Sequence, residues 1–177
     1  MSKASPHHPI LILTTGGTID KAYFDALSQY QVVESVVQRI LATARVTHPF
    51  EVQEVLRKDS LEMTDADRDS LEAHIRRSRV RRIIITHGTD TMTQTAERLA
   101  HLVDDEAESG AQKRTIVLTG SLAPARFSES DATFNLGMAF ATAQTAPCGI
   151  FIAMNGKIFP AAMAQKDRQR SEFVLKP

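Results

Sequence analysis

The sequence predicts an α/β fold: a single domain of three layers, in which helices cover both faces of an open and mostly parallel sheet. Two observations carry this prediction. Continuous apolar runs of strand length, bounded by glycine or polar residues, are typical of strands buried on both faces. These runs alternate with segments of helical spacing, and strands joined through helices run parallel with right-handed crossovers.

The size and charge of the chain indicate how many domains it forms and which partners its charge does not attract. Its 177 residues suit one domain with one core, since domains run to roughly 100–200 residues. We expect residues 1–9, which include two prolines and two histidines, to be a disordered leader, and residues 10–177 to form the domain. The 21 basic and 21 acidic residues balance, so no net field attracts nucleic acid or an anionic membrane.

Cysteine and hydropathy point to the compartment. Cys148 is the one cysteine of the sequence, which excludes a disulfide within the chain and a cysteine zinc site. No stretch approaches the ~20 apolar residues that a membrane-spanning helix needs. We therefore expect a soluble cytoplasmic protein, with Cys148 buried beside a strand.

The first elements follow from apolar periodicity. Residues 10–14 form a continuous apolar run and are predicted as a buried strand. Residues 20–30 lack periodicity and are interpreted as a loop. Residues 32–44 carry apolar side chains at helical spacing, and residues 50–56 alternate as a half-buried strand does.

A second helix is predicted to begin at Thr64. Thr64 and Asp67 have the spacing of a capping box, with aspartate in place of glutamate. The apolar stripe of this helix includes Leu71 and Ile75. The next strand is predicted over residues 80–86.

The alternation continues in the second half. The predicted elements are a helix over residues 92–103, an exposed acidic turn over 104–110, a strand over 115–118, a helix over 131–144 and a strand over 149–153. In the last helix, Phe134, Met138 and Ala141 share a face. The remaining residues are interpreted as polar and irregular.

Two threonine motifs directly follow predicted strands: Thr15-Gly16-Gly17-Thr18 and His87-Gly88-Thr89-Asp90-Thr91. Ligands of open α/β sheets bind outside the carboxyl ends of the strands, and glycine turns there let hydroxyls approach a substrate. The positions therefore predict an active site with hydroxyl chemistry. Nucleotide and serine-hydrolase sites are disfavoured, because the sequence lacks G-x-x-x-x-G-K-[ST] and G-x-G-x-x-G, and Gly120-Ser121 lacks the second glycine of G-x-S-x-G.

Spacing alone leaves a structural alternative for each candidate. A threonine hydroxyl is a weak nucleophile until a base takes its proton, and threonines at strand ends also cap helices, so Thr18 and Thr89 fit either role. Asp90 can hold a ligand's ammonium group or cap a helix. Lys166 fits a proton relay or a solvated side chain, and Tyr23 fits a closing lid or a half-buried ring.

In order and spacing, four stretches resemble the amino-terminal domain of bacterial-type L-asparaginases. They are Thr15-Gly16-Gly17-Thr18-Ile19, His87-Gly88-Thr89-Asp90-Thr91-Met92, Thr119-Gly120-Ser121 and Asp131 to Asn135-Leu136. The resemblance runs from about Ile10 to Lys166. It implies hydrolysis of the side-chain amide of asparagine, in some members also of glutamine, through a threonine acyl-enzyme and without metal or cofactor.

The resemblance also implies catalytic roles. Thr18 matches the nucleophile, and Thr89, Asp90 and Lys166 match the second catalytic triad of the family. Thr89 would help to position or activate the attacking group. Tyr23 is preferred over Tyr30 as the tyrosine of the loop that closes on the nucleophile, because a short lid reaches back more easily.

Substrate contacts follow from the same resemblance. Ser60 resembles the serine that binds the substrate α-carboxylate, and Asp90 would hold the α-ammonium group. Gly17 and Gly88 would line the substrate site beside Thr89. Many members follow the serine with a glutamine that contacts the substrate amine, whereas Leu61 stands here.

Family members usually carry a second, smaller domain whose residues complete the site of a neighbouring subunit, and this sequence ends at Pro177 before it. We expect a homo-oligomer, a dimer or tetramer, that hydrolyses L-asparagine and uses glutamine poorly. Two alternatives remain: a non-catalytic sensor that binds asparagine or aspartate, and an ammonia-generating subunit of a larger amidotransferase. A domain without any site would leave both threonine motifs unexplained.

Overall fold

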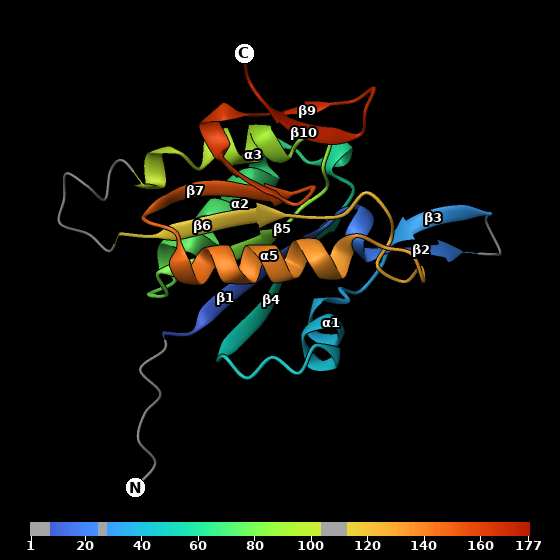
Figure 1. The fold of residues 1–177 in the computed structure, drawn as a ribbon, viewed down its shortest axis with the longest axis horizontal. Helices are drawn as coiled ribbons and strands as arrows, with labels where there is room; N and C mark the ends of the chain where they lie inside the picture. The colour runs from blue at the N-terminus through green and yellow to red at the C-terminus, as the bar shows by residue number, and fades with distance from the viewer. Residues whose placement is uncertain (1–7, 25–27, 104–112) are drawn as a thin grey trace, which may run out of the picture.

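The computed structural model describes residues 8–24, 28–103 and 113–177, and at its centre lies a six-stranded sheet (Figure 1). The strand order is β4-β1-β5-β6-β7-β8. The strands are β1 (Ile10–Gly16), β4 (Phe50–Lys58), β5 (Arg82–Thr86), β6 (Thr115–Thr119), β7 (Gly149–Met154) and β8 (Lys157–Pro160). All neighbours are parallel except β8, which returns antiparallel to β7, so the predicted mostly parallel sheet is confirmed.

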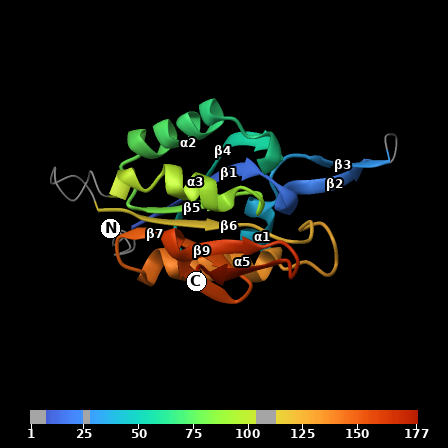
Figure 2. The ribbon, with the colours of Figure 1, turned by 90° about the horizontal axis from the view of Figure 1, so that it is seen from above.

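Helices cover both faces of this sheet, as predicted (Figure 2). The helices are α1 (Val37–Thr43), α2 (Asp65–Arg77), α3 (Met92–Arg98) and α5 (Ala132–Thr145). Residues of α2 and α3 join the core on one face, and residues of α1 and α5 join the core on the other. Successive side chains of a strand point to opposite faces, so Ile83 and Ile85 lie in the first core and Ile84 in the second.

Two small antiparallel pairs lie outside the central sheet. Strands β2 (Lys21–Phe24) and β3 (Gln29–Val32) form a hairpin, and β9 (Ala164–Asp167) pairs with β10 (Glu172–Leu175). The 3-10 turns η1 (Thr18–Asp20) and η4 (Ala161–Met163) link these pairs to the sheet, and η3 (Ser60–Glu62) links β4 to α2. The predictions of a loop over 20–30 and of an irregular tail after 153 were therefore wrong.

Two helices are shorter than predicted. Helix α1 begins at Val37 rather than Val32, because Val32 pairs in β3 and the Val36 amide donates to the Asp20 carboxylate at 3.0 Å. Helix α3 ends at Arg98, and residues 101–103 are helical again after a turn. The capping box is confirmed: the Thr64 hydroxyl accepts from the Asp67 amide, and the Asp67 carboxylate accepts from the Thr64 amide.

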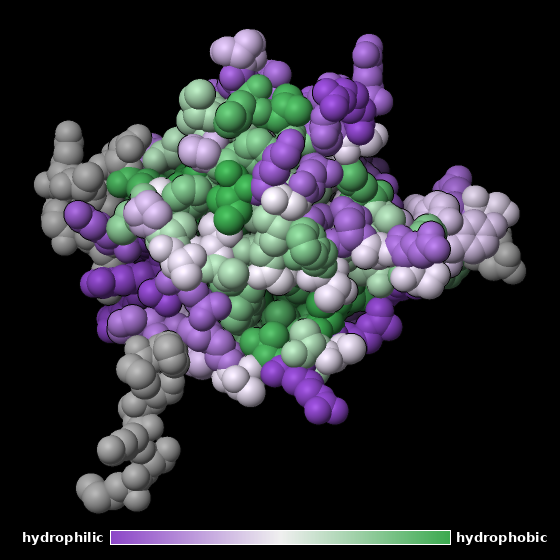
Figure 3. Space-filling model, viewed as in Figure 1, coloured by the Kyte–Doolittle hydropathy of each residue, from purple (hydrophilic) through white to green (hydrophobic). Residues whose placement is uncertain are grey.

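Helix α5 turns an unexpected face to solvent. Phe134 is 62% exposed, Ala141 is exposed and Met138 is half-buried, so the face they share points outward. Figure 3 shows apolar and weakly polar groups gathered over this helix. The sequence of α5 contains no charged residue, so it offers no polar stripe to mark the solvent side.

Two further predictions concern residues outside those that the structure describes, and the prediction for Cys148 was wrong. The acidic turn over 104–110 and residues 1–7 of the predicted leader lie outside the described residues. Cys148 is exposed, so the prediction of a buried thiol was wrong. Among the helices that the structure describes, none is both long and apolar enough to span a membrane.

Candidate active site

The strand ends bring three loops to one edge of the sheet. Strand β1 pairs with β5 so that Thr14 lies opposite Thr86, and it pairs with β4 so that Gly16 lies opposite Lys58. The loops that follow β1, β4 and β5 therefore emerge side by side at the carboxyl edge. The Thr15 hydroxyl donates to the Thr86 carbonyl at 2.8 Å and so links the ends of β1 and β5.

Glycine makes the contact between these loops possible. A Cβ atom on Gly17 would lie 2.4 Å from the Gly88 nitrogen, and one on Gly88 would lie 2.5 Å from the Ser60 Oγ. Gly17 also has φ +81°, a conformation that side chains other than glycine rarely adopt. The backbones of the two threonine motifs and the Ser60 hydroxyl are thus in direct van der Waals contact.

Lys166 joins the site from a distant part of the chain. Its Nζ donates to the Thr89 Oγ1 at 2.7 Å and to the Asp90 Oδ1 at 2.9 Å. The side chain of Lys166 is only 15% exposed, because β9 carries it inward rather than leaving it in a solvated tail. Thr89, Asp90 and Lys166 therefore form one charge-assisted cluster.

The Ser60 hydroxyl is prepared for a ligand. Ser60 is 1% exposed, and its Oγ has no hydrogen-bond partner within the described part of the chain. The Ser60 carbonyl accepts from the Thr91 hydroxyl at 2.8 Å, which fixes its backbone against the second motif. A buried hydroxyl without a partner is costly, so a ligand oxygen at this position would gain a hydrogen bond that the protein leaves unmade.

Behind Thr89, a chain of hydrogen bonds fixes the proton on His87. The Arg68 Nε can only donate, and it does so to the Thr95 Oγ1 at 3.1 Å. The Gly88 carbonyl can only accept, so the His87 Nδ1–H donates to it at 2.7 Å, and the Nε2 of the neutral ring accepts from the Thr95 hydroxyl at 2.8 Å. Burial lowers the pKa of His87 to about 4, so the ring is neutral at pH 7.

The structure does not bring every predicted residue into contact. The Thr18 hydroxyl makes no hydrogen bond to any part of the chain that the structure describes. Tyr23 is 52% exposed, and its ring packs edge-on against Tyr30, its cross-strand partner, with centroids 5.4 Å apart. Leu61 is 65% exposed, so its side chain points away from the buried Ser60.

One supporting group was not singled out from the sequence. The Asp131 carboxylate accepts from the amides of Leu122 and Ala123, and the Asn135 side chain donates to both Asp131 and the Gly120 carbonyl. These bonds fix the connection that follows β6. Asp131 and Asn135 lie in a stretch noted for its family resemblance, which was the available signal.

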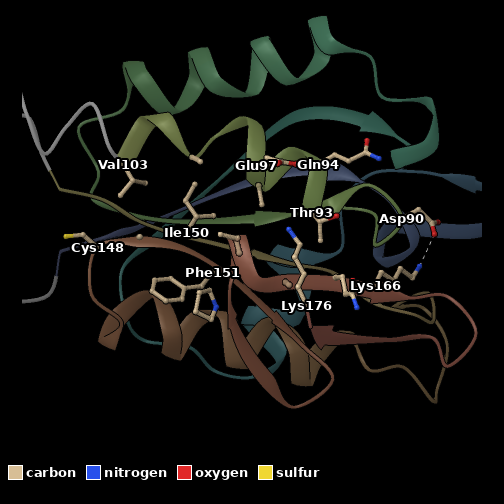
Figure 4. Close-up of a pocket in the computed structure, with 18 of the residues that line it drawn as sticks. Asp90, Thr93, Gln94, Glu97, Val103, Cys148, Ile150, Phe151, Lys166 and Lys176 are labelled. Carbon is tan, nitrogen blue, oxygen red and sulfur yellow. Dashed lines mark hydrogen bonds and ion pairs between the residues drawn. The ribbon is translucent and has the colours of Figure 1, made fainter.

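A groove of about 820 Å³ opens beside the site (Figure 4). Asp90 and Lys166 lie at one end, and Cys148 and Val103 lie at the other. Its walls come from α3 on one side and from β7, η4 and β9 on the other. Within residues 8–24, 28–103 and 113–177, no group of three His, Cys, Asp or Glu side chains is arranged to hold a metal ion.

Comparison with known proteins decides the family. The sequence model described as "Asparaginase, N-terminal" matches residues 9–172. The chain belongs to this family. The resemblance carried by the threonine motifs is thereby confirmed.

Two relatives and one solved structure illustrate the range of this asparaginase family. An L-asparaginase from Thermococcus kodakarensis is 30% identical over 89% of this chain and 47% of its own length. A glutaminase-asparaginase from Acinetobacter glutaminasificans is 29% identical over 86% of this chain and 47% of its own. L-asparaginase I from Vibrio cholerae has the same fold, with a TM-score of 0.80 at 23% identity over 96% of this chain and 51% of its own. The chain thus spans about half the length of the relatives it matches.

Proposed function

We propose that this chain hydrolyses the side-chain amide of L-asparagine to L-aspartate and ammonia, through an acyl-enzyme on Thr18. The observation that carries the proposal is the cluster of Lys166, Thr89 and Asp90, which joins residues 77 positions apart beside the first threonine motif. Two names among the relatives, L-asparaginase and glutaminase-asparaginase, support the class of substrate.

Substrate binding uses groups that the protein leaves available. The Ser60 hydroxyl donates to the α-carboxylate, since it has no other partner among the described residues. The Asp90 carboxylate, which is 35% exposed, accepts from the α-ammonium group while it keeps its ion pair with Lys166. Gly17 and Gly88 let the two motifs and Ser60 lie in direct contact, which brings the groups that line the proposed substrate site together.

The bond changes then follow from the arrangement of the hydroxyls. The Thr89 Oγ1 accepts a hydrogen bond from the Lys166 Nζ, so its own O–H is free to point into the site. Thr18 Oγ attacks the amide carbon, and its proton passes through the Thr89 hydroxyl to the leaving nitrogen, which departs as ammonia. Water then attacks the acyl group, releases aspartate and returns the proton to Thr18.

The oxyanion needs donors that are not already in use. The Gly17 amide donates to the Lys58 carbonyl at 2.9 Å, so it does not serve. We assign this role to the Thr18 and Thr89 amides, because the one hydrogen of the Thr89 hydroxyl carries the proton to the leaving nitrogen. Lys166 stabilises the charge that develops on Thr89, because its ammonium group lies 2.7 Å from that oxygen.

Glutamine should be the poorer substrate. Its extra methylene displaces the amide carbon from Thr18, and a displacement of ~1 Å can cost about a hundredfold in rate. The proposed assembly is a homo-oligomer, and the proposed compartment is the cytoplasm, since the single cysteine forms no disulfide within the chain.

The test is ammonia release from L-asparagine and from L-glutamine by the purified chain. Thr18→Ala should lower kcat by roughly a thousandfold or more, and Thr89→Val should lower it comparably, because the two hydroxyls act in one proton path. Thr133→Ala, an exposed threonine on α5, is the matched control and should match the parent protein. Trapping an acyl group on Thr18 by rapid acid quench and mass spectrometry would identify the nucleophile.

The two alternatives predict different results. Binding of asparagine or aspartate by calorimetry, without ammonia release, would replace the proposal with a sensor. Release that appears only after a second polypeptide is added would indicate a subunit of a larger amidotransferase. Equal rates on asparagine and glutamine would remove the proposed preference but leave the amidase.

A further inference from the structure

The β2–β3 hairpin is attached to the body of the protein by the segment Ala125-Arg126-Phe127. The Ala125 amide donates to the Ile19 carbonyl at 3.2 Å, one residue after Thr18. The Arg126 guanidinium donates to the Glu34 carbonyl at 3.0 Å, two residues after β3 ends. The segment therefore contacts the chain on both sides of the hairpin base.

An aromatic contact continues this attachment along the hairpin. The Phe127 ring packs edge-on against Tyr30 with centroids 5.9 Å apart, and Tyr30 packs against Tyr23 at 5.4 Å. All three rings are about half exposed: 44% for Phe127, 50% for Tyr30 and 52% for Tyr23. Because about half of each ring faces solvent, each edge-to-face pair is a sizeable part of what fixes it.

The loop that carries this segment is held at Ala123. The Ser130 hydroxyl and the Ser121 hydroxyl both donate to the Ala123 carbonyl, at 2.9 and 2.6 Å, and the Asp131 carboxylate holds the Ala123 amide. Asp131 is in turn bonded to Asn135 on α5. Phe127 thus extends from a loop that hydrogen bonds tie to a helix, toward a hairpin that stands out from the sheet (Figure 1).

We propose that Phe127 is a positioning residue for the two hairpin tyrosines, and through Tyr30 for Tyr23. The inference deepens the proposed function and rests on it, because it takes Tyr23, which the family resemblance assigns to the loop that closes on the nucleophile, to act on Thr18 in the proposed reaction. Phe127 does not touch the reacting atoms. It acts by limiting the orientations that Tyr30 and Tyr23 sample, so the hairpin is ordered before substrate binds.

The composition of the chain provides a specific probe that needs no activity. The sequence has two tyrosines and no tryptophan, and both tyrosines lie in the hairpin. Protein labelled with 3-fluorotyrosine should therefore give two 19F resonances, assigned by Tyr23→Phe and Tyr30→Phe. Phe127→Ala should shift and sharpen the Tyr30 resonance most and the Tyr23 resonance less.

Matched variants separate this effect from the loss of any exposed ring. Phe134→Ala removes a phenylalanine that is 62% exposed on α5 and should leave both resonances in place. Phe127→Trp keeps an aromatic ring without adding a third labelled tyrosine and should restore the positions of the two hairpin resonances. Unchanged far-ultraviolet circular dichroism and melting temperature would show that Phe127→Ala still folds.

The kinetic arm tests the link to the reaction. Phe127→Ala should lower kcat about two- to tenfold, because the loss of one aromatic pair changes the population of the ordered hairpin by about that factor. It should leave KM within about twofold, because Ser60 and Asp90 hold the substrate. In a Tyr23→Phe background the same substitution should have no further effect on kcat, since Phe127 acts only through that tyrosine.

The outcomes are distinct. Unchanged 19F resonances in Phe127→Ala would overturn the positioning role, whether or not the parent protein is active. Shifted resonances with an unchanged kcat, or a full effect of Phe127→Ala in the Tyr23→Phe background, would overturn the link to catalysis. A parent protein that releases no ammonia would defeat the proposed function and its kinetic arm, while the resonances would still decide whether Phe127 orders the hairpin.

Discussion

The two threonine loops end neighbouring strands and contain the same glycine and threonine residues, yet the structure holds their hydroxyls in opposite ways. The Thr89 hydroxyl accepts from Lys166, which also pairs with Asp90, and the buried His87 ring bonds to the Gly88 carbonyl behind it. The Thr18 hydroxyl has no hydrogen-bond partner among the described residues, although the Gly17 amide before it is fixed to Lys58.

In the proposed mechanism, this difference matches the separate requirements of a proton relay at Thr89 and a nucleophile at Thr18. A group that relays a proton gains from a fixed cation, because the cation stabilises charge at one position without reorganisation. A nucleophile must form a new bond, so a strong hydrogen bond that had to be broken first would slow it. The Thr89 loop is therefore built for electrostatics, and the Thr18 loop is built to position a backbone and leave one side chain free.

The largest effect is expected when the ammonium group of Lys166 is removed, because this abolishes the difference between the Thr89 and Thr18 hydroxyls. Lys166→Met deletes both hydrogen bonds of the ammonium group. The Thr89 hydroxyl then has neither a neighbouring cation nor a hydrogen-bond donor, like the Thr18 hydroxyl. We expect kcat to fall about a hundred- to ten-thousandfold, the usual effect of losing a positioned acid–base group. Steady-state ammonia release measures it.

Lys166→Arg provides the control, because it keeps the charge but moves it on a longer, planar group. It should retain the Asp90 ion pair and fold normally, yet recover only part of the rate. A Lys166→Met variant with parental kcat would show that Thr89 needs no cation, and the proposed division between the loops would have to be abandoned.

The backbone contact between the loops gives a second test, on stability. Gly17→Ala places a Cβ 2.4 Å from the Gly88 nitrogen at φ +81°, so one of the two loops must move. We expect the free energy of unfolding to fall by about 2–5 kcal/mol from backbone strain and overpacking together. Urea unfolding followed by circular dichroism measures the change.

Gly137→Ala is the matched substitution. Gly137 lies in α5 with nothing within 4 Å of a Cβ, so alanine should be neutral or stabilise the protein by up to about 1 kcal/mol. If both variants lost a similar free energy of unfolding, the loss would come from replacing a glycine as such and not from the contact between the threonine loops.

The same contrast shows what could be read from the sequence. The positions of both threonine loops were predictable, because apolar runs of strand length fix where the strands end and glycine marks the turns. The partner of Thr89 was predictable only through the family resemblance, since Lys166 lies 77 residues away and no local pattern links the two. The contacts of Gly17 with Lys58 and Gly88, which place the backbone before Thr18, are tertiary and are not encoded in spacing.

Elements that depend on tertiary contacts were also missed. The β2–β3 hairpin was interpreted as a loop because its strands are four residues each and show no buried alternation. The buried face of α5 was not evident because an uncharged helix has no polar stripe. The α2 cap, in contrast, depends on two residues three positions apart, and local chemistry of that kind is legible in a sequence.

The histidine behind the Thr89 loop gives the last and smallest test, on pH. The pKa of His87 falls from the usual 6.5 to about 4 in the folded protein, because burial disfavours the imidazolium. Between these values the unfolded chain binds a proton that the folded protein does not, so the free energy of unfolding decreases as the pH falls from about 6.5 to 4 and is fully retained above 6.5. At about 1.4 kcal/mol per unit, the total loss is about 3 kcal/mol.

Denaturant unfolding at several pH values isolates this contribution when the parent protein is compared with His87→Gln. The variant is less stable at every pH, because glutamine cannot bond to both Gly88 and Thr95 as the ring does, but its stability should decline less steeply between pH 6.5 and 4. The Asp67 carboxyl, whose pKa is lowered to about 2 by the Thr64 amide and Lys58, acts in both proteins and cancels in the difference. Parallel pH profiles would show that the pKa of His87 is the same in the folded and the unfolded protein, so that burial does not favour the neutral ring that we place behind Thr89.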